Sequence, residues 1–459
     1  MRSTPESAQS VQGASLRRET CPGTRTRFRW VICSLLFWVT TANYIDRGVF
    51  GNLAPELQKQ IGWTQNDYWN MTVAFNAAYA VSLLVAGRLM DVLGLRWGFA
   101  LSCAFWGLAA MGHSLVSTVT GFFVVRILLG LGEGGNFPAA IKTVAEWFPK
   151  RERALATGLF NSGSNVGGIL VPFGLPFVLA TFSSWAVFGA ANGWRGAFLI
   201  TGIFDLAWII AWLMIYKRPE RHPRVSAAEL AWINSEPPEP TVKIPWGRLL
   251  PHRQTWAYVA AKSMTDCFWW FYLFGAPYFF SDRFGLSLKA RSVPIAAIYI
   301  CASVGSIGGG WLSGHLMKIG WSVNRARKTT LLAFAALVLP VVFATVTATP
   351  WIAVALIAIA AAAHQGWSAN VFSLAGDMFP RRIVGSVTGL GGFAGSIGGI
   401  LLFAVVGQIR KASIARGEAG NYFPIFLAAS LAYLAALLIT HLLAPKLEPA
   451  QVEEKTTIS

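Results

Sequence analysis

The stretch Arg126-Ile-Leu-Leu-Gly-Leu-Gly-Glu133-Gly-Gly-Asn-Phe-Pro138 places two charges in an apolar run that begins near Val119. A charged side chain at the centre of a bilayer costs at least ~2.5–3 kcal/mol unless it meets water or a partner. Arg126 and Glu133 are seven residues apart, so a helix brings them to one face, two turns apart. The stretch also contains four glycines, which allow neighbouring backbones to approach closely. It predicts either a structural ion pair that locks two helices or a functional site.

The composition of the chain indicates a helical membrane protein. Of its 459 residues, 54% are hydrophobic and 13% are charged, whereas soluble proteins carry about 25% charged residues. The apolar residues fall into long runs. The net charge of +17 comes from Lys and Arg that cluster in short segments between these runs. This is the positive-inside pattern of membrane proteins, so we expect no nucleic-acid partner.

The cysteines and the N-terminus exclude two other classes. The five cysteines are odd in number and no pair has the spacing of a metal site, so we expect buried packing residues with no disulfide framework and no metal. Residues 1–29 are polar and contain six arginines, unlike a cleavable signal peptide. The first apolar run, 30–51, is therefore expected to remain as a membrane helix.

Apolar runs of membrane-spanning length predict an all-α integral membrane protein with twelve transmembrane helices. The expected spans are 30–51, 68–90, 97–116, 119–142, 153–176, 195–216, 255–280, 290–313, 329–348, 350–375, 384–408 and 423–443. The domain organisation follows from these spans. We expect an N-terminal arm (1–29), a six-helix bundle (30–216), a linker (217–254), a second six-helix bundle (255–443) and a tail (444–459).

The distribution of basic residues predicts the orientation of the chain. Of the 38 Lys and Arg residues, 27 lie in the N-terminal arm, the linker, the tail and the loops on their side. Eight lie in the opposite loops, and Arg47, Arg126 and Lys262 fall within helices. Cytoplasmic loops carry the excess of Lys and Arg, so both termini and the linker are expected in the cytoplasm.

The two halves of the chain resemble each other. Residues 147–158, beginning Trp-Phe-Pro-Lys-Arg, align with residues 378–389, beginning Met-Phe-Pro-Arg-Arg, at an offset of 231. Ile61-Gly-Trp-Thr64 likewise aligns with Phe284-Gly-Leu-Ser287 at an offset of 223. Six-helix repeats of this kind predict two pseudo-symmetric bundles with a binding site between them, near the middle of the membrane.

The loop predicted between the second and third helices contains a candidate conformational latch, a set of charged residues that would hold the cytoplasmic side closed. The motif is G-x3-D-x2-G-x-R, and we expect its acid to pair with the nearby arginines at helix ends. Its residues are Gly87, Arg88, Asp91, Gly94 and Arg96. Gly314 stands at the corresponding acidic position of the second half.

Polar residues on the first two helices are candidates for a transport site. Asp46 and Arg47 are adjacent and point about 100° apart, so they should face different partners. The alternative is that both lie in interfacial water. Tyr44 precedes this pair, and Asn76 and Tyr79 offer a polar face from the second helix.

The fifth predicted helix contains Asn161-Ser-Gly-Ser-Asn165 at membrane depth. Small and polar residues in a membrane helix serve close packing or line a wet cavity. We expect packing for Ser162 and Gly163, and cavity lining for Asn161, Ser164 and Asn165.

The second half of the chain offers further candidates. Lys262 and Asp266 are an i,i+4 pair that can neutralise itself, and they precede an aromatic run that includes Trp270. Core packing is the better interpretation for most of that run. His364, within a segment that also contains Trp367 and Asn370, aligns with Glu133 in the repeat, although a hydrogen-bonded core histidine is the commoner explanation. Asp205 is a lone acid without an assigned role.

Several motifs together resemble the anion:cation symporter family of the major facilitator superfamily, and bacterial hexuronate transporters most closely. The motifs are Asn43-Tyr-Ile-Asp-Arg47, Leu131-Gly-Glu-Gly-Gly-Asn-Phe-Pro138, Glu146-Trp-Phe-Pro-Lys-Arg-Glu-Arg153, Asn161-Ser-Gly-Ser-Asn-Val-Gly167, Lys262 to Tyr272 and His315 to Lys328. The similarity covers about 30–440. Gly48 and Asn52 depart from the bulkier or apolar residues expected after Asp-Arg, which affects the substrate more than the coupling.

The resemblance implies a proton-coupled symporter of the bacterial inner membrane that imports an organic acid anion by alternating access, with a hexuronate or related sugar acid expected. It implies that Asp46 and Glu133 carry protons and that Arg47 and Arg126 bind the carboxylate or restrain the acids. Tyr44, Tyr79 and the polar residues of 161–165 would line the sugar-acid site, and Lys262 would supply a cation from the second half. Asn76, Trp270, His364, Trp367 and Asn370 complete the expected substrate site. We expect a monomer that uses the proton gradient and no cofactor.

Two other classes of function are less consistent with the sequence. A membrane enzyme is disfavoured because the chain contains no HExxH, GxSxG or Cys/His cluster. A nutrient sensor would require a soluble output domain, and neither the linker nor the tail is long enough for one. Among transporters, a permease for galactonate or for an aromatic acid such as phthalate remains an alternative.

Overall fold

The computed structural model describes residues 26–189, 191–235, 246–379, 381–416, 421–448 and 450, and every regular element in these ranges is a helix. The first half contains α1 (Phe28–Ile61), α2 (Gln65–Gly112), α3 (Val119–Glu133), α4 (Asn136–Trp147), α5 (Lys150–Ser183) and α6 (Gly193–Ile215). The linker contains η1 (Pro219–Arg221), α7 (Ala227–Ile233) and η2 (Trp246–Arg248). The second half contains α8 (Arg253–Phe284), α9 (Leu288–Lys318), α10 (Val323–Val338), η3 (Leu339–Thr345), α11 (Pro350–Met378), α12 (Arg381–Ala415) and α13 (Phe423–Leu443).

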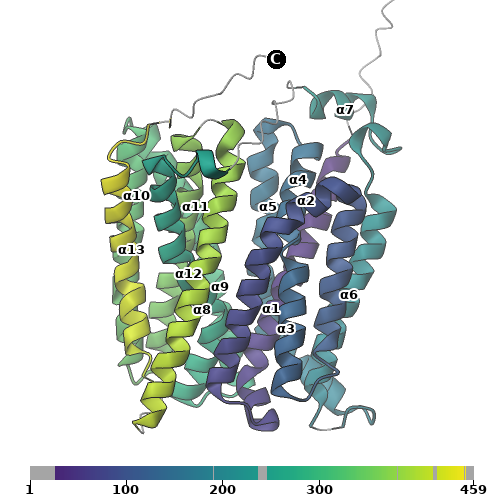
Figure 1. The fold of residues 1–459 in the computed structure, drawn as a ribbon, viewed down its shortest axis with the longest axis vertical. Helices are drawn as coiled ribbons and strands as arrows, with labels where there is room; N and C mark the ends of the chain where they lie inside the picture. Colours follow the sequence, from purple (N-terminus) through teal and green to yellow (C-terminus); the bar gives the residue numbers. More distant parts are fainter. Residues whose placement is uncertain are drawn as a thin grey trace, which may run out of the picture.

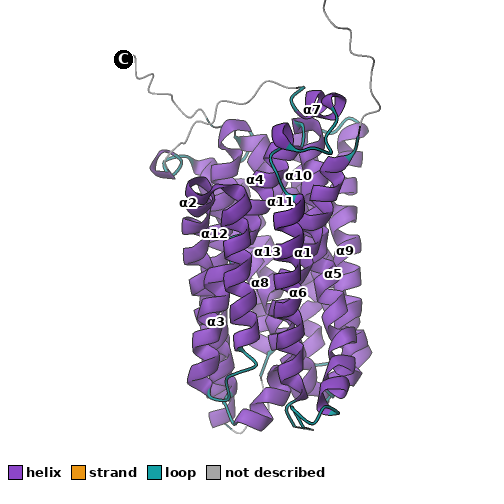
Figure 2. Ribbon diagram, turned by 90° about the vertical axis from the view of Figure 1, so that its right-hand side faces the viewer, coloured by secondary structure: helices purple, strands orange, loops and turns teal. Residues whose placement is uncertain are grey.

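The helices form two bundles that stand side by side. In Figure 1, α1–α6 occupy one side of the molecule and α8–α13 the other, with the long helices running nearly parallel to the vertical axis. Figure 2 shows the same alignment from a direction at right angles. Helices α2 and α5 of the first bundle pack against α12 and α9 of the second. The prediction of a helical membrane protein with two six-helix bundles is therefore confirmed.

Nine helices among the described residues are long and apolar enough to cross a membrane. The three other predicted crossings, 68–90, 119–142 and 255–280, also form helices in the bundles, within α2, α3–α4 and α8. Two of the three, 119–142 and 255–280, are less apolar or less continuous than the nine. For example, α8 contains Lys262 and Asp266, and the fourth crossing is divided between α3 and α4.

The predicted loop between the second and third crossings is reduced to one residue. Gly94 has φ 74° and ψ 153°, and helix continues on both sides of it within α2. A positive φ favours glycine because it has no Cβ atom. The two arms of α2 both pack on α3, where a Cβ atom at Gly130 would lie 2.5 Å from the Phe75 carbonyl oxygen and one at Gly132 would lie 2.6 Å from the Trp106 Cβ.

The helix ends agree with the repeat inferred from the sequence. Gly62 and Gly285 end α1 and α8 in the left-handed conformation, with φ values of 79° and 64°. Two residues later, the hydroxyls of Thr64 and Ser287 cap the next helix by accepting a backbone N–H. The aligned tetrapeptides therefore form the same turn in both bundles.

The linker does not pass freely between the bundles, because α7 docks on the N-terminal bundle. The buried Glu229 carboxylate accepts hydrogen bonds from Thr26 Oγ1 (2.6 Å) and from the backbone N–H groups of Phe28 (3.0 Å) and Arg29 (3.1 Å). It thus satisfies donors at the start of α1. Trp232 Nε1 also donates to Glu152 Oε1 of α5 (3.0 Å).

Among the described residues, hydrogen bonds between the two bundles lie in the half of the molecule away from α7. They link the end of α1 and the start of α2 to the end of α8 and the start of α9. Examples are Tyr68 Oη to the Phe274 carbonyl (2.6 Å), Tyr278 Oη to the Ala54 carbonyl (3.1 Å) and Arg291 Nη2 to Glu56 Oε2 (2.6 Å).

Candidate functional site

A buried ion pair joins α1 to α3. Arg47 Nε of α1 donates to Glu133 Oε2 of α3, and both side chains are almost completely buried. The sequence had suggested Arg126 as the partner of Glu133, because the two share a helix face. The structure instead pairs Glu133 with Arg47, since a neighbouring helix can present its guanidinium directly to the carboxylate.

Aromatic rings from three helices surround the Arg47 guanidinium. Its carbon lies 5.1 Å from the ring centroid of Tyr44 on α1 and 4.6 Å from that of Tyr79 on α2. It lies 5.1 Å from the ring of Trp270 on α8. A guanidinium at these distances is attracted to the ring faces. Three of the predicted site residues are therefore gathered around a fourth, and one of them, Trp270, comes from the second bundle.

Arg126 has a different environment, in which aromatic rings surround its guanidinium and no described residue hydrogen-bonds it. Its guanidinium carbon lies 4.4 Å from the ring of Phe50, 4.3 Å from that of Phe75 and 5.8 Å from that of Phe274. None of its three side-chain nitrogens has a hydrogen-bond partner among the described residues, although the side chain is fully buried. An unpaired buried charge is costly, so this residue has capacity for an anionic ligand.

Asp46 faces side chains of α6. Its carboxyl group faces the side chains of Thr201 and Asp205, and both carboxyl groups are buried. The expectation that Asp46 and Arg47 face different partners is confirmed, and the alternative that both lie in interfacial water is wrong. Asp205 had no assigned role in the sequence, because nothing in its local pattern reveals that α6 brings it to Asp46.

In the polar cluster on α5, residues 161–165, some side chains are buried against other helices and others are exposed. A Cβ atom at Gly163 would lie 2.5 Å from the Phe37 carbonyl oxygen of α1, which confirms close packing there. The side chain of Ser162 is exposed, so the packing expected for it is wrong. Ser164 Oγ donates to the Asn161 carbonyl (2.7 Å). Asn165 Oδ1 is buried without a hydrogen-bond donor among the described residues.

Asn76 on α2 lies at the boundary between the bundles. Its Nδ2 donates to the Thr72 carbonyl at 2.8 Å, within its own helix. Its Oδ1 has no donor among the described residues and would lie 4.0 Å from a Cβ atom added at Gly399 of α12. This oxygen is therefore an available acceptor between the two bundles.

The predicted site residues of the second half make most of their contacts within the second bundle. Lys262 Nζ pairs with Asp266 Oδ2 at 2.6 Å, as its spacing predicted. His364 Nδ1 lies 2.7 Å from Tyr433 Oη, and Trp367 packs edge-on against the same tyrosine. Asn370 Nδ2 donates to the carbonyls of Gly309 and Gly366 (3.0 and 2.9 Å). These contacts give His364, Trp367 and Asn370 partners inside the second bundle, unlike Arg126.

The candidate latch falls partly outside the described residues. The side chains of Arg88 and Asp91, and the surroundings of Gly87, belong to the part of the chain that is left undescribed. Gly94 supplies the break in α2. Arg96 Nη2 donates to the Leu213 carbonyl of α6 at 2.5 Å, so it connects the second arm of α2 to the end of α6.

Comparisons with known proteins agree with this architecture. Residues 36–403 match the Major Facilitator Superfamily. The chain is 29% identical over 387 residues to the hexuronate transporter of Escherichia coli (strain K12), covering 83% of this chain and 87% of that protein. It is 31% identical over 311 residues to the galacturonate transporter of Dickeya chrysanthemi, covering 66% of this chain and 87% of that protein.

Solved structures show the same fold. A crystal structure of a D-xylose–proton symporter aligns with a TM-score of 0.69 at 15% identity, covering 90% of this chain and 97% of that chain. A bacterial homologue of the human lysosomal transporter Spinster, in an inward-facing and unoccupied conformation, aligns with a TM-score of 0.67 at 17% identity, covering 92% and 96%. The fold, the family match over most of the chain and the sugar-acid transporters among its relatives lead to one conclusion. This chain is a multi-pass membrane transporter that belongs to the Major Facilitator Superfamily.

Proposed function

We propose that this protein is a proton-coupled symporter that imports a sugar-acid anion, with a hexuronate as the best candidate. The observation that carries the proposal is the fully buried guanidinium of Arg126, which has no hydrogen-bonding partner among the described residues. A carboxylate would satisfy its donors and offset the cost of the buried charge. The relatives named for hexuronate and galacturonate transport support the choice of substrate class.

The basic residues support an orientation with α7 and both termini in the cytoplasm of a bacterial cell. The side predicted to be cytoplasmic carries 27 of the 38 Lys and Arg residues. In this orientation, the bonds that Tyr68 and Tyr278 make between the bundles lie at the outer end. We assign the structure to the inward-facing half of an alternating-access cycle, in which the outer end is closed.

The Arg47–Glu133 ion pair supports a mechanism that couples proton binding to substrate binding. A proton that enters the site and binds Glu133 removes the negative charge that holds Arg47. Arg47 then becomes free to bind the substrate carboxylate together with Arg126. Loss of the substrate to the cytoplasm lets Arg47 pair with Glu133 again and displace the proton. Proton and anion thus travel in the same direction.

Asp46 is a candidate for a second proton carrier. Its carboxyl group faces that of Asp205 in a buried environment. All four carboxyl oxygens lack a hydrogen-bond donor among the described residues, and two ionised carboxylates in one buried site repel each other, so a proton on one of them would relieve this repulsion. This arrangement supports a role for Asp46 in proton transfer, with Asp205 as its partner.

The rest of the site supports recognition of a polyhydroxylated substrate. The hydroxyls of Tyr44 and Tyr79 and the free acceptor Asn76 Oδ1 could bond sugar hydroxyl groups, and Trp270 offers an apolar ring face. The same rings could stack on an aromatic acid. Galactonate and phthalate are therefore the rival substrates for a direct comparison.

The decisive experiment measures uptake by purified protein in liposomes, with galacturonate, glucuronate, galactonate and phthalate as substrates. In Glu133→Gln we expect loss of accumulation driven by a pH gradient, while substrate counterflow is retained, because Gln mimics the protonated acid. Glu220→Gln, an exposed linker acid, serves as the control and should behave like the wild type. Unchanged pH-driven accumulation in Glu133→Gln would remove Glu133 from the coupling mechanism.

A further inference from the structure

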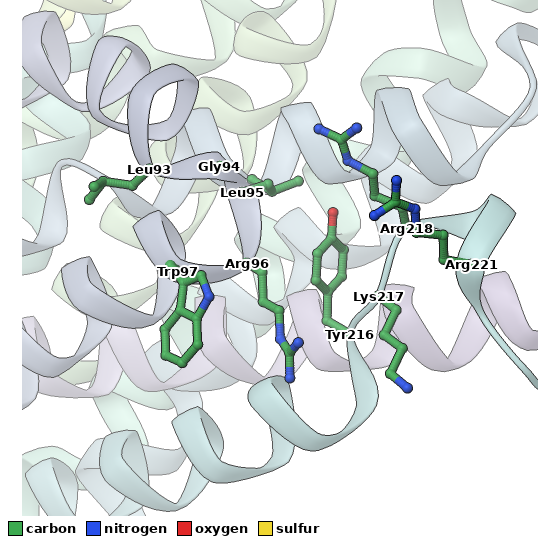
Figure 3. Close-up of a pocket in the computed structure, with 9 residues that line it drawn as sticks. All are labelled: Leu93, Gly94, Leu95, Arg96, Trp97, Tyr216, Lys217, Arg218 and Arg221. Atoms are coloured by element: carbon green, nitrogen blue, oxygen red, sulfur yellow. The ribbon is translucent and has the colours of Figure 1, made fainter.

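A basic cavity lies at the α7 end of the molecule, apart from the site between the bundles. It has a volume of about 320 Å3 and is formed where the break in α2 meets the end of α6. Figure 3 shows Tyr216 between Arg96 on one side and three further basic side chains on the other. The lining residues are Leu93, Gly94, Leu95, Arg96, Trp97, Tyr216, Lys217, Arg218 and Arg221.

The charge of this cavity is largely uncompensated. Among the described residues, the side chains of Lys217, Arg218 and Arg221 make no hydrogen bond or ion pair, and all three are exposed. Two acids lie close by in the fold. Glu146 accepts a hydrogen bond from Tyr216 Oη (2.6 Å), and Glu220 lies between Arg218 and Arg221 in the chain. The four basic residues that line the cavity outnumber these two acids, and the excess of positive charge favours a bound anion.

The backbone around the cavity is fixed by contacts between α2 and α6. Arg96 Nη2 donates to the Leu213 carbonyl, and Trp212 Nε1 donates to the Arg96 carbonyl (3.0 Å). These bonds hold the two elements together at residues that line or adjoin the cavity. The cavity is consequently formed by two elements that are hydrogen-bonded to each other.

Exposed apolar side chains run from this cavity along the outer surface of both helices. On α2, Trp97 is 60% exposed and Leu101, four residues later, is 54% exposed. On α6, Met214 is 76% exposed and Ile210, four residues earlier, is 62% exposed. Residues four apart lie on one face of a helix, so each pair forms a stripe that ends at the cavity. In a membrane, such stripes contact acyl chains.

We propose that this cavity binds the phosphate of an anionic phospholipid headgroup, with the acyl chains lying along the exposed stripes of α2 and α6. Basic pockets beside transmembrane helices recognise anionic headgroups through charge and hydrogen bonding. A free phosphate ion would satisfy the same cations, but it would make no use of the apolar stripes. The inference does not depend on the transported substrate.

The test measures lipid retention by native mass spectrometry of the purified full-length protein, with phosphatidylglycerol against phosphatidylcholine. The pocket variant is Lys217→Gln/Arg218→Gln/Arg221→Gln. The control variant, Arg224→Gln/Arg248→Gln/Lys318→Gln, changes the net charge equally at exposed positions that do not line the cavity. We expect wild type and control to retain phosphatidylglycerol selectively. We expect the pocket variant to lose about 100-fold in affinity, since each basic residue near an anionic lipid contributes about a factor of five.

Three outcomes would overturn the proposal. These are undiminished retention by the pocket variant, equal loss in both variants, and displacement of the lipid by excess inorganic phosphate, which would assign the cavity to a soluble anion.

A second experiment measures the quenching of tryptophan fluorescence in the wild-type protein by brominated lipids. Phosphatidylglycerol brominated on its acyl chains should quench protein fluorescence more than the brominated phosphatidylcholine does, and Trp97→Phe should abolish that difference. An unchanged difference in Trp97→Phe would place the lipid elsewhere.

Discussion

Glu133, the last residue of α3, pairs with Arg47 of α1, while Arg126 of its own helix is left without a hydrogen-bonding partner among the described residues. The two arginines therefore differ in what their removal should do. Loss of Arg47 leaves the buried Glu133 carboxylate without its hydrogen-bonded ion-pair partner, whereas loss of Arg126 removes a buried charge that no side chain among the described residues hydrogen-bonds.

The geometry of the Arg47 guanidinium should matter as much as its charge. Arg47→Lys keeps a positive charge but replaces a planar fork that contacts four rings and a carboxylate with a compact ammonium group. We expect the variant to fold and to lose binding of the substrate. Thermal-shift titration with the transported sugar acid measures this directly. Near-normal affinity in Arg47→Lys would move the carboxylate site away from Arg47.

Arg126→Met should abolish binding of the substrate without lowering the stability of the fold. Replacing an unpaired buried charge by an apolar side chain is often neutral or stabilising, so the melting temperature without ligand should stay the same or rise. The additional stabilisation produced by the substrate should disappear.

Arg47→Met is the matched comparison for this variant. It leaves Glu133 buried without its ion-pair partner, and breaking a buried pair costs about 3–5 kcal/mol. A clear drop in its melting temperature is therefore expected. A larger drop in Arg126→Met than in Arg47→Met would contradict the assignment of partners.

Close helix packing should make Gly305 intolerant of substitution. A Cβ atom there would lie 2.0 Å from the Ala362 carbonyl oxygen of α11, whereas Gly308 on the same helix has no neighbour within 4 Å. Overpacking typically costs about 1–3 kcal/mol, and a backbone neighbour cannot move aside. We expect Gly305→Ala to lower the melting temperature and Gly308→Ala to leave it unchanged or slightly higher. Equal behaviour of the two variants would contradict the packing of α9 on α11.

The contact of α7 with α1 should weaken in acid. Burial raises the pKa of Glu229, but hydrogen bonds from Thr26, Arg29 and Phe28 outweigh it and hold the pKa below its ordinary value. A carboxyl group with a lowered folded-state pKa stabilises the fold above its unfolded-state pKa, which is about 4.3. That contribution is lost as the pH falls through the folded-state pKa.

Thermal unfolding of wild type and Glu229→Gln across the acid range measures this effect. We expect the wild type to be more stable at pH 7 and the difference to shrink below about pH 4.3. A difference that is independent of pH would mean that the charge of Glu229 does not contribute. Glu220→Gln, in the same linker but exposed, is the control and should show no such difference.

The architecture was predictable because three features of the sequence agree. The lengths of the apolar runs, the basic residues in the loops between them and the internal repeat all indicate two bundles of membrane-spanning helices. The aligned turns at Gly62 and Gly285 are one case in which a short motif specified the local structure. The candidate site was predicted as a set of residue types, and Arg47, Tyr44, Tyr79 and Trp270 do lie together.

The partners within the site could not be predicted in the same way. Helical periodicity places Arg126 and Glu133 on one face but gives no information on which neighbouring helix approaches that face. The Arg47–Glu133 pair and the approach of Asp46 to Asp205 depend on how the fold places α1 relative to α3 and packs it against α6. The single-residue break at Gly94 was missed for a related reason, because the polar residues around it resemble a longer loop.

The docking of α7 makes the linker an asymmetric connection. Glu229 and Trp232 tie this helix to the ends of α1 and α5, so α7 belongs mechanically to the N-terminal bundle. In the rocking motion that we propose for alternating access, α7 is therefore expected to move as part of the first bundle.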